Sequence, residues 1–196
     1  MHDSELDRPI LYIFSGLPAS GKSTLAQAVA RYRGAVYLRI DTIEQELRES
    51  TGIEVQAEGY RLAYRIAADN LRLGLSVVAD SCNPIELTRR EWEAVAREAG
   101  AAYLNVEVVC SDPGEHRERA ESRPADVPGL RLPTWREIQD REYHPWSAER
   151  LVIDTAGRSR ETCVDDLLAR LPGGKRSHAD SWSRTTWRSD AESERE

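Results

Sequence analysis

Lysine is scarce in this sequence of 196 residues: among 27 basic residues only Lys22 and Lys175 are lysines, and the others are arginines. Cysteine is rare as well, and Cys82, Cys110 and Cys163 have no spacing typical of a zinc site. This pattern argues against a zinc module and a disulfide scaffold, and it is typical of a reducing compartment.

Long apolar runs are absent. No run approaches the roughly 18 apolar residues of a membrane span, and the first ten residues, MHDSELDRPI, lack the apolar core of a signal peptide. We therefore expect a cytoplasmic protein with no membrane partner. A basic excess is also missing, because 27 basic residues face 34 acidic ones and the net charge is −7. This balance argues against generic attraction to a nucleic-acid backbone.

Short apolar runs of strand length alternate with helical patterns from Pro9 to Leu171. We expect strands at 10–15, 35–40, 75–79, 103–109 and 151–153, and helices at 22–32, 42–48, 58–73, 84–99, 113–123, 134–143 and 161–171. Such alternation predicts an α/β fold in which a doubly wound, parallel, five-stranded sheet is the middle of three layers.

The composition changes after residue 172. Residues 175–196 hold four apolar residues, and their five basic and five acidic residues cancel. Such a segment cannot bury enough apolar surface to offset the entropy lost on ordering. We expect an N-terminal extension at 1–8, one folded domain at 9–172 and a disordered polar tail at 173–196.

A phosphate-binding motif follows the first expected strand and precedes the first expected helix. Its residues are Gly16, Leu17, Pro18, Ala19, Ser20, Gly21, Lys22 and Ser23, a complete G-x-x-x-x-G-K-S. The glycines let backbone N–H groups and the helix N-terminus face the phosphates of ATP, and Lys22 adds a mobile ammonium. The Ser23 hydroxyl is expected to bind Mg²⁺, with Thr24 nearer the α-phosphate.

This motif, an acidic residue after the second strand and an arginine-rich helix after the fourth together resemble the small P-loop kinases. These include adenylate-kinase-like, gluconate-kinase-like and chloramphenicol-phosphotransferase-like enzymes, and kinases classed only as AAA-type ATP-binding proteins. The resemblance covers about residues 9–171. It implies a nucleoside-monophosphate-kinase-like P-loop fold with strand order 2-3-1-4-5 and a small mobile lid at about 117–146.

Two carboxylates lie at the ends of expected strands, where ligands bind in open α/β sheets. Asp41 is the candidate general base that takes a proton from the acceptor hydroxyl, and it is also placed to cap the helix at 42–48. Asp80 is the candidate Mg²⁺ ligand beside Ser23. Substrate contact and a capping role for the following helix remain alternatives for Asp80.

Arg119 and Arg123 are four residues apart on one helix and are expected to face the same way. The resemblance implies that both reach the nucleotide, one over the adenine and one on the phosphates, with Arg131 as a weaker candidate. A solvated helix face is the alternative. The aromatic stretch Tyr143–Trp146 suggests an anchor for the lid base more than a substrate pocket. Thr155–Gly157 falls where the resemblance places the adenine-side loop.

These features favour an ATP-dependent kinase that phosphorylates a hydroxyl of a small molecule, as a monomer or a homodimer, with Lys22, Asp41, Arg119 and Arg123 as catalytic residues. One alternative is a polynucleotide or nucleoside 5′-hydroxyl kinase, although polynucleotide kinases have an arginine where this sequence has Glu44. Another is a regulatory NTP-binding ATPase. Residues 41–58 hold six acidic residues against Arg48 alone, which favours a neutral or cationic acceptor over an anionic one.

Truncation after Gly174 is expected to leave the melting temperature and the activity unchanged, because the removed segment has few apolar residues to bury. Thermal unfolding and activity measurements on the full and shortened chains test this. A clear loss of stability would mean that Trp182 or Trp187 docks on the domain.

Overall fold

The computed structural model of the protein describes residues 8–172. The expected tail at 173–196, and the extension at 1–8 except for residue 8, lie outside the described residues. Within the described part no helix combines the length and the apolar character that a membrane span requires.

The five expected strands form one parallel sheet, as predicted. The strands are β1 (Ile10–Ser15), β2 (Val36–Arg39), β3 (Val77–Asp80), β4 (Ala102–Val109) and β5 (Leu151–Asp154). Their order is β2-β3-β1-β4-β5, which confirms the order that the resemblance implies. Each neighbouring pair runs parallel, so all five carboxyl ends meet at one edge of the sheet.

Seven helices accompany the strands in residues 8–172. They are α1 (Lys22–Arg33), α2 (Ile40–Thr51), α3 (Glu58–Arg72), α4 (Glu86–Glu98), α5 (Pro113–Ser122), α6 (Trp135–Gln139) and α7 (Arg160–Ala169). Two differ notably from the prediction. Helix α2 begins directly after β2, and α6 stops at Gln139 because the following chain is held instead by contacts with the α4 region, such as the 2.8 Å bond from His144 N–H to the Pro84 carbonyl.

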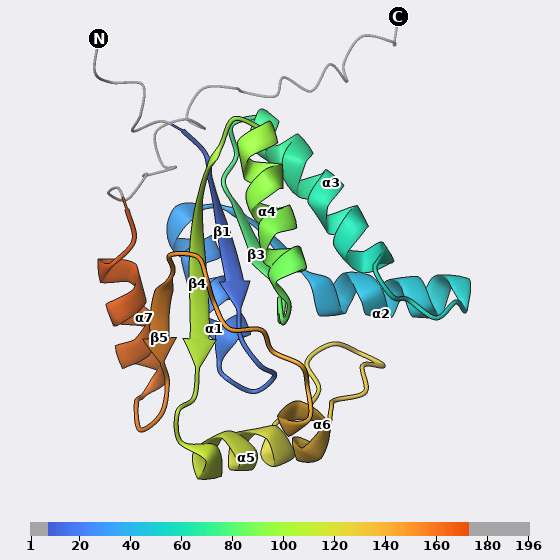
Figure 1. Cartoon of the computed structure of the whole chain (residues 1–196), viewed down its shortest axis with the longest axis vertical. Coiled ribbons are helices and arrows are strands. Elements are labelled where there is room, and N and C mark those ends of the chain that lie inside the picture. The colour runs from blue at the N-terminus through green and yellow to red at the C-terminus, as the bar shows by residue number, and fades with distance from the viewer. Residues whose placement is uncertain (1–7, 173–196) are drawn as a thin grey trace, which may run out of the picture.

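The core lies in two layers, one on each side of the sheet. The central strand β1 explains this, since Tyr12 and Phe14 pack on the α1 and α7 side while Leu11 and Ile13 pack on the α3 and α4 side. A central parallel strand is covered on both faces, which accounts for its nearly continuous apolar sequence. The three-layer architecture is therefore confirmed (Figure 1).

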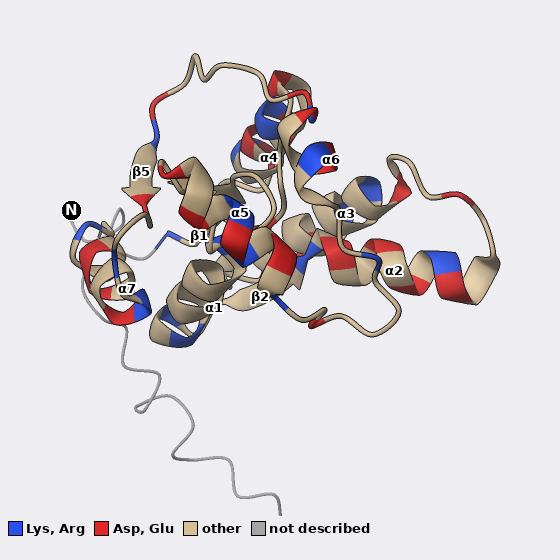
Figure 2. Cartoon of the chain, turned by 90° about the horizontal axis from the view of Figure 1, so that it is seen from below, with Lys and Arg blue, Asp and Glu red and all other residues tan. Residues whose placement is uncertain are grey.

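Helices α5 and α6, which fall in or next to the segment expected to form a lid, lie at the edge where the strands end. Helices α5 and α6 sit beyond the strand arrowheads in Figure 1, on the same side as the loop between β1 and α1. Figure 2 views the molecule from this edge and shows alternating acidic and basic segments along α2 and α5. The charged residues that the sequence analysis singled out therefore gather around one end of the sheet.

Replacing Trp92 by alanine is expected to lower the free energy of unfolding by about 3–5 kcal/mol, the usual range for a large buried side chain. Trp92 is 0 % exposed, and its ring meets the Tyr64 ring edge-on at a centroid distance of 4.6 Å. The matched control is Leu87→Ala on the same helix, since Leu87 is 61 % exposed. Urea unfolding of both variants measures the difference, and equal losses would contradict the core assignment.

Candidate active site

The loop between β1 and α1 has the backbone shape that phosphate binding requires. Gly16 has φ +143°, and a Cβ there would lie 2.2 Å from the Val108 carbonyl oxygen, so only glycine fits. Gly21, with φ +92°, is the N-cap residue of α1, and no side chain caps this helix. The first N–H groups of α1 are therefore left to face an anion.

Lys22 and Asp80 form a buried ion pair at the base of this loop. The Nζ of Lys22 donates to Oδ1 of Asp80 at 2.9 Å, and the side chains are 7 % and 1 % exposed. The Tyr37 hydroxyl donates to the other oxygen, Oδ2, at 2.6 Å. Burial alone would raise the pKa of Asp80, but the Lys22 charge and the Tyr37 hydrogen bond outweigh it and hold that pKa below its usual range.

The pair also affects the lysine. Burial alone would lower the pKa of Lys22, but the attraction of Asp80 outweighs it and raises that pKa, so the ammonium stays charged. Because both oxygens of Asp80 are engaged and its carboxylate is stabilised, it is poorly suited to take a proton. The capping alternative for Asp80 is wrong, since α4 begins at Glu86 with Ile85 as its N-cap residue.

A cavity of about 1140 Å³ opens over the loop. Most of the expected site residues line it, namely Leu17, Pro18, Ala19, Gly21, Lys22, Ser23, Thr24, Asp41, Arg119, Arg123 and Arg131. Gly16, Ser20 and Asp80 are not among the lining residues. Two of these residues contact residues that do line the cavity. Asp80 accepts a hydrogen bond from Lys22, and the Ser20 carbonyl accepts one from the Thr155 hydroxyl.

Asp41 lies on α2, and both Asp41 and Thr155 line the cavity. The capping role considered for Asp41 is wrong, because the helix starts at Ile40 with Arg39 as its N-cap residue. Asp41 occupies the first turn instead, and its side chain is 42 % exposed. The Nη2 atom of Arg39 lies 3.7 Å from the Asp41 carboxylate. This contact is long, and Asp41 remains accessible to a ligand in the cavity.

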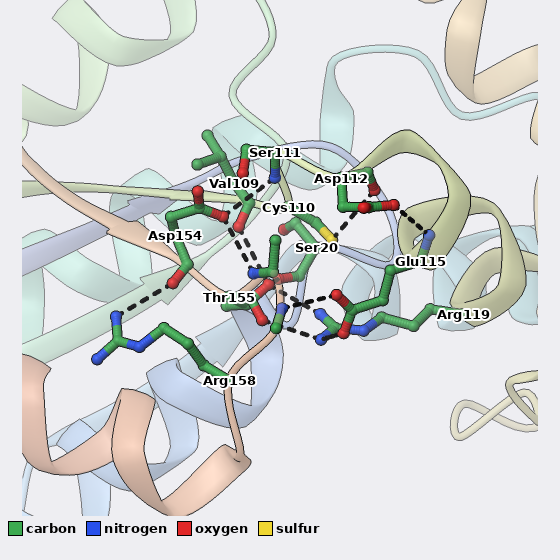
Figure 3. Close-up of polar contacts among 12 residues, drawn as sticks. Ser20, Val109, Cys110, Ser111, Asp112, Glu115, Arg119, Asp154, Thr155 and Arg158 are labelled. Carbon is green, nitrogen blue, oxygen red and sulfur yellow. Dashed lines mark hydrogen bonds and ion pairs between the residues drawn. The ribbon is translucent and has the colours of Figure 1, made fainter.

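Arg119 and Arg123 both line the cavity, but they face different neighbours. Arg119 donates to the Thr155 hydroxyl at 2.8 Å and to the Thr155 carbonyl at 3.0 Å, and it is paired with Glu115 (Figure 3). The Arg123 side chain has no hydrogen-bond or ion-pair partner in residues 8–172, and its Nε is buried. Burial lowers the pKa of Arg123, and the nearby Asp41 opposes this.

The sequence analysis missed three of the residues around the cavity. Arg39 holds Asp126 of the lid loop through two hydrogen bonds of 2.7 and 2.9 Å. Tyr37 contacts Asp80, and Arg158 lines the cavity beside Thr155. Tyr37 and Arg39 are two residues apart on β2, so they lie on the same face of the strand, close to its carboxyl end and to Asp41. Their position at the end of a strand could therefore have indicated that they belong to the site.

The aromatic stretch behaves as an anchor in the described structure. Arg89 is 3 % exposed, and its guanidinium carbon lies 4.1 Å from the Trp146 ring centroid and 4.9 Å from that of Tyr143. None of the residues from Tyr143 to Trp146 lines the cavity. Cys82 does line it, but burial raises the pKa of its thiol, which is the environment of an unreactive cysteine.

The comparisons with known proteins agree with this geometry. A family model described as an AAA domain, AAA_33, matches residues 11–141. The chain belongs to this AAA-domain family. No curated protein sequence matches the AAA-domain chain. The match to this family and the similar solved structures confirm the resemblance to small P-loop kinases that the motif indicated.

Three solved structures illustrate the shared fold. Mycobacterium tuberculosis APS kinase CysC, in complex with AMPPNP and APS, is 21 % identical over 83 % of this chain and 96 % of its own, with a TM-score of 0.62. A gluconokinase from Sinorhizobium meliloti is 17 % identical over 83 % and 91 %, with a TM-score of 0.59. Chaetomium thermophilum Kti12 in complex with ADP-AlF3 is 18 % identical over 83 % and 100 %, with a TM-score of 0.58. The AAA-domain chain thus has a nucleotide-binding P-loop kinase fold.

The Lys22→Ala variant is expected to lose stability, because Lys22 is the ion-pair partner of the buried Asp80 carboxylate. Removing one partner of a buried ion pair costs about 3–5 kcal/mol at neutral pH. In the wild type the lowered pKa of Asp80 contributes stability above the unfolded pKa of about 3.9. In the variant the buried carboxylate must instead protonate, so the loss should shrink as the pH falls towards 4.

Urea unfolding at several pH values between about 4 and 8 measures this dependence. The matched control is Arg31→Ala, an exposed cation on the same helix. A loss for Lys22→Ala that stays constant across the range would contradict the role of the ion pair.

Proposed function

We propose that this protein is an ATP-dependent kinase that transfers the γ-phosphoryl group to a hydroxyl of a small molecule. One observation carries the proposal: the same cavity is lined by the P-loop lysine, by the accessible carboxylate of Asp41 and by the guanidinium of Arg123, which has no partner in residues 8–172. These are the three kinds of group that phosphoryl transfer uses, namely a phosphate cradle, a base and a charge stabiliser.

The residues present fit ATP and Mg²⁺. The uncapped N-terminus of α1 and the glycine turn at Gly16 suit a polyphosphate. Ser23 and Asp80 offer oxygen ligands of the kind that hold Mg²⁺ together with phosphates and water, and Ser23 helps to lower the pKa of Asp80. Mg²⁺ bound there would neutralise charge on the phosphates.

The transfer follows from the positions of these groups. The acceptor hydroxyl oxygen forms a bond to the γ-phosphorus, the bond to the bridging oxygen of ADP breaks, and the hydroxyl proton passes to Asp41. Lys22 and Arg123 stabilise the charge that develops on the phosphoryl oxygens. Arg119, tied to Thr155, would border the adenine end of the nucleotide.

The charge of the cavity does not favour a neutral or cationic acceptor. The prediction of such an acceptor counted residues 41–58 only, whereas Arg39, Arg123 and Arg141 also line the cavity. Its basic lining residues outnumber its acidic ones, and part of that excess serves the phosphates of ATP. We therefore keep the acceptor class as a small hydroxyl compound without assigning its charge.

A regulatory NTPase is the second candidate function. It is supported by the fold shared with Kti12, whose solved structure contains ADP-AlF3. The two candidates differ in their need for an acceptor, because a kinase keeps ATP hydrolysis low until a hydroxyl compound occupies the site beside the base. The polynucleotide kinase alternative is weaker, since Glu44 lines the cavity and pairs with Arg48 at 3.0 Å.

The deciding experiment measures ATP consumption by the full chain against pooled sugars, nucleosides, amino alcohols, hydroxy acids and a 5′-hydroxyl oligonucleotide. A low basal rate that one small-molecule pool raises strongly supports the kinase. Steady ATP hydrolysis that no pool alters would support the regulatory NTPase. Stimulation by the oligonucleotide alone would support the polynucleotide kinase.

The Asp41→Asn variant is expected to lower the acceptor-stimulated kcat by about 10²–10⁴-fold, because general-base catalysis contributes that much. ATP affinity should change little, since a general base acts on the acceptor hydroxyl and Asp41 lies outside the P-loop motif of residues 16–23. The matched control is Glu46→Gln, an exposed acidic residue on the same helix. If Asp41→Asn instead abolishes ATP binding and spares kcat, Asp41 serves the nucleotide and is not the base.

A further inference from the structure

Tyr37 has no place in the proposed chemistry, yet it makes one of the shortest contacts at the base of the site. Its hydroxyl donates to Oδ2 of Asp80 at 2.6 Å. The two residues come from neighbouring strands, with Tyr37 opposite Val78 and Asp80 two residues further along β3. Burial, followed by the adjacent Asp80 charge, raises the pKa of Tyr37, so the hydroxyl remains a donor.

The two oxygens of Asp80 therefore have different partners. Oδ1 accepts from Lys22, and Oδ2 accepts from Tyr37. Lys22 is the partner that has another task in the proposed function, because its ammonium is needed at the phosphates of ATP. When Lys22 turns to the phosphates, Oδ1 loses its ammonium partner while Oδ2 keeps its hydrogen bond.

A carboxylate that is 1 % exposed cannot rely on water to replace a lost partner. With both oxygens free, Asp80 could rotate and present either oxygen in either direction. The Tyr37 hydroxyl prevents this, since it fixes one oxygen on the β2 side. The other oxygen then remains on the side of Lys22 and Ser23, the residues at the start of α1.

We propose that Tyr37 is a positioning residue that holds Asp80 through Oδ2, so that Oδ1 is the oxygen offered to Mg²⁺ when nucleotide draws Lys22 away. This inference rests on the proposed function. It assigns different tasks to the two oxygens of one carboxylate, and it gives a role to the half-buried Tyr37 hydroxyl that contacts Asp80. The expected consequence concerns the contribution of Mg²⁺ to nucleotide affinity.

The test compares Tyr37→Phe with the wild type by calorimetric titration of AMPPNP, once with MgCl₂ and once with EDTA. The variant removes only the hydroxyl. We expect AMPPNP affinity in EDTA to stay within about twofold. The gain in affinity on adding MgCl₂ should fall by about tenfold or more, the usual effect of removing a group that orients a metal ligand.

The matched control is Tyr103→Phe, which removes a tyrosine hydroxyl from β4 outside the cavity. Asp80→Asn provides the upper limit of the effect. Thermal unfolding of each variant separates the positioning role from a structural one, because a structural role would lower the melting temperature and weaken AMPPNP binding equally in MgCl₂ and in EDTA.

A Tyr37→Phe variant that keeps the whole Mg²⁺-dependent gain overturns the inference, as does an equal loss in both buffers. In either case the wild type would still bind AMPPNP, and the proposed function would stand. A wild type that fails to bind AMPPNP at all would overturn the proposed function and this inference with it.

Discussion

The buried contact between Lys22 and Asp80 is the interaction on which the rest of the site depends. It joins the first residue of α1 to the last residue of β3, and so connects the phosphate loop to the neighbouring strand end. Both charges are almost fully removed from water, and each is tolerable only because of the other. The ion pair therefore ties the start of α1 to the end of β3.

The sheet and its strand-end residues could be predicted from the sequence because they follow from local pattern and connectivity. The continuous apolar run at Ile10–Ser15 indicates a strand covered on both faces, and a parallel sheet brings all carboxyl ends to one edge. Asp41 and Lys22 could thus be assigned to one cavity. The helix start after β2 could not be, because no cap residue marks it: α2 begins directly from the strand at Ile40.

The side-chain contacts of the site residues could not be predicted from the sequence. The prediction that Arg119 and Arg123 share a helix and face the same way is wrong, because α5 ends at Ser122 and Arg123 follows it in an extended conformation. Arg119 therefore contacts Thr155, whereas Arg123 is influenced by Asp41. The count of acidic residues in 41–58 is incomplete for a related reason, since the arginines that line the cavity include residues of β2, of the loop after α5 and of the chain after α6. The net charge of the cavity depends on which distant segments of the chain come together, and the composition of one segment does not predict it.

The anchoring of Arg89 between two aromatic rings limits how the lid can move. One end of the lid is fixed where the Asp112 side chain caps α5 and Asp154 holds the backbone of Ser111. The other end is fixed where Tyr143 and Trp146 enclose a guanidinium that also binds backbone carbonyls after β3. The middle of the segment is held as well, because Arg39 binds Asp126 through two hydrogen bonds. Contacts along its whole length must therefore break before this segment can leave the edge of the sheet.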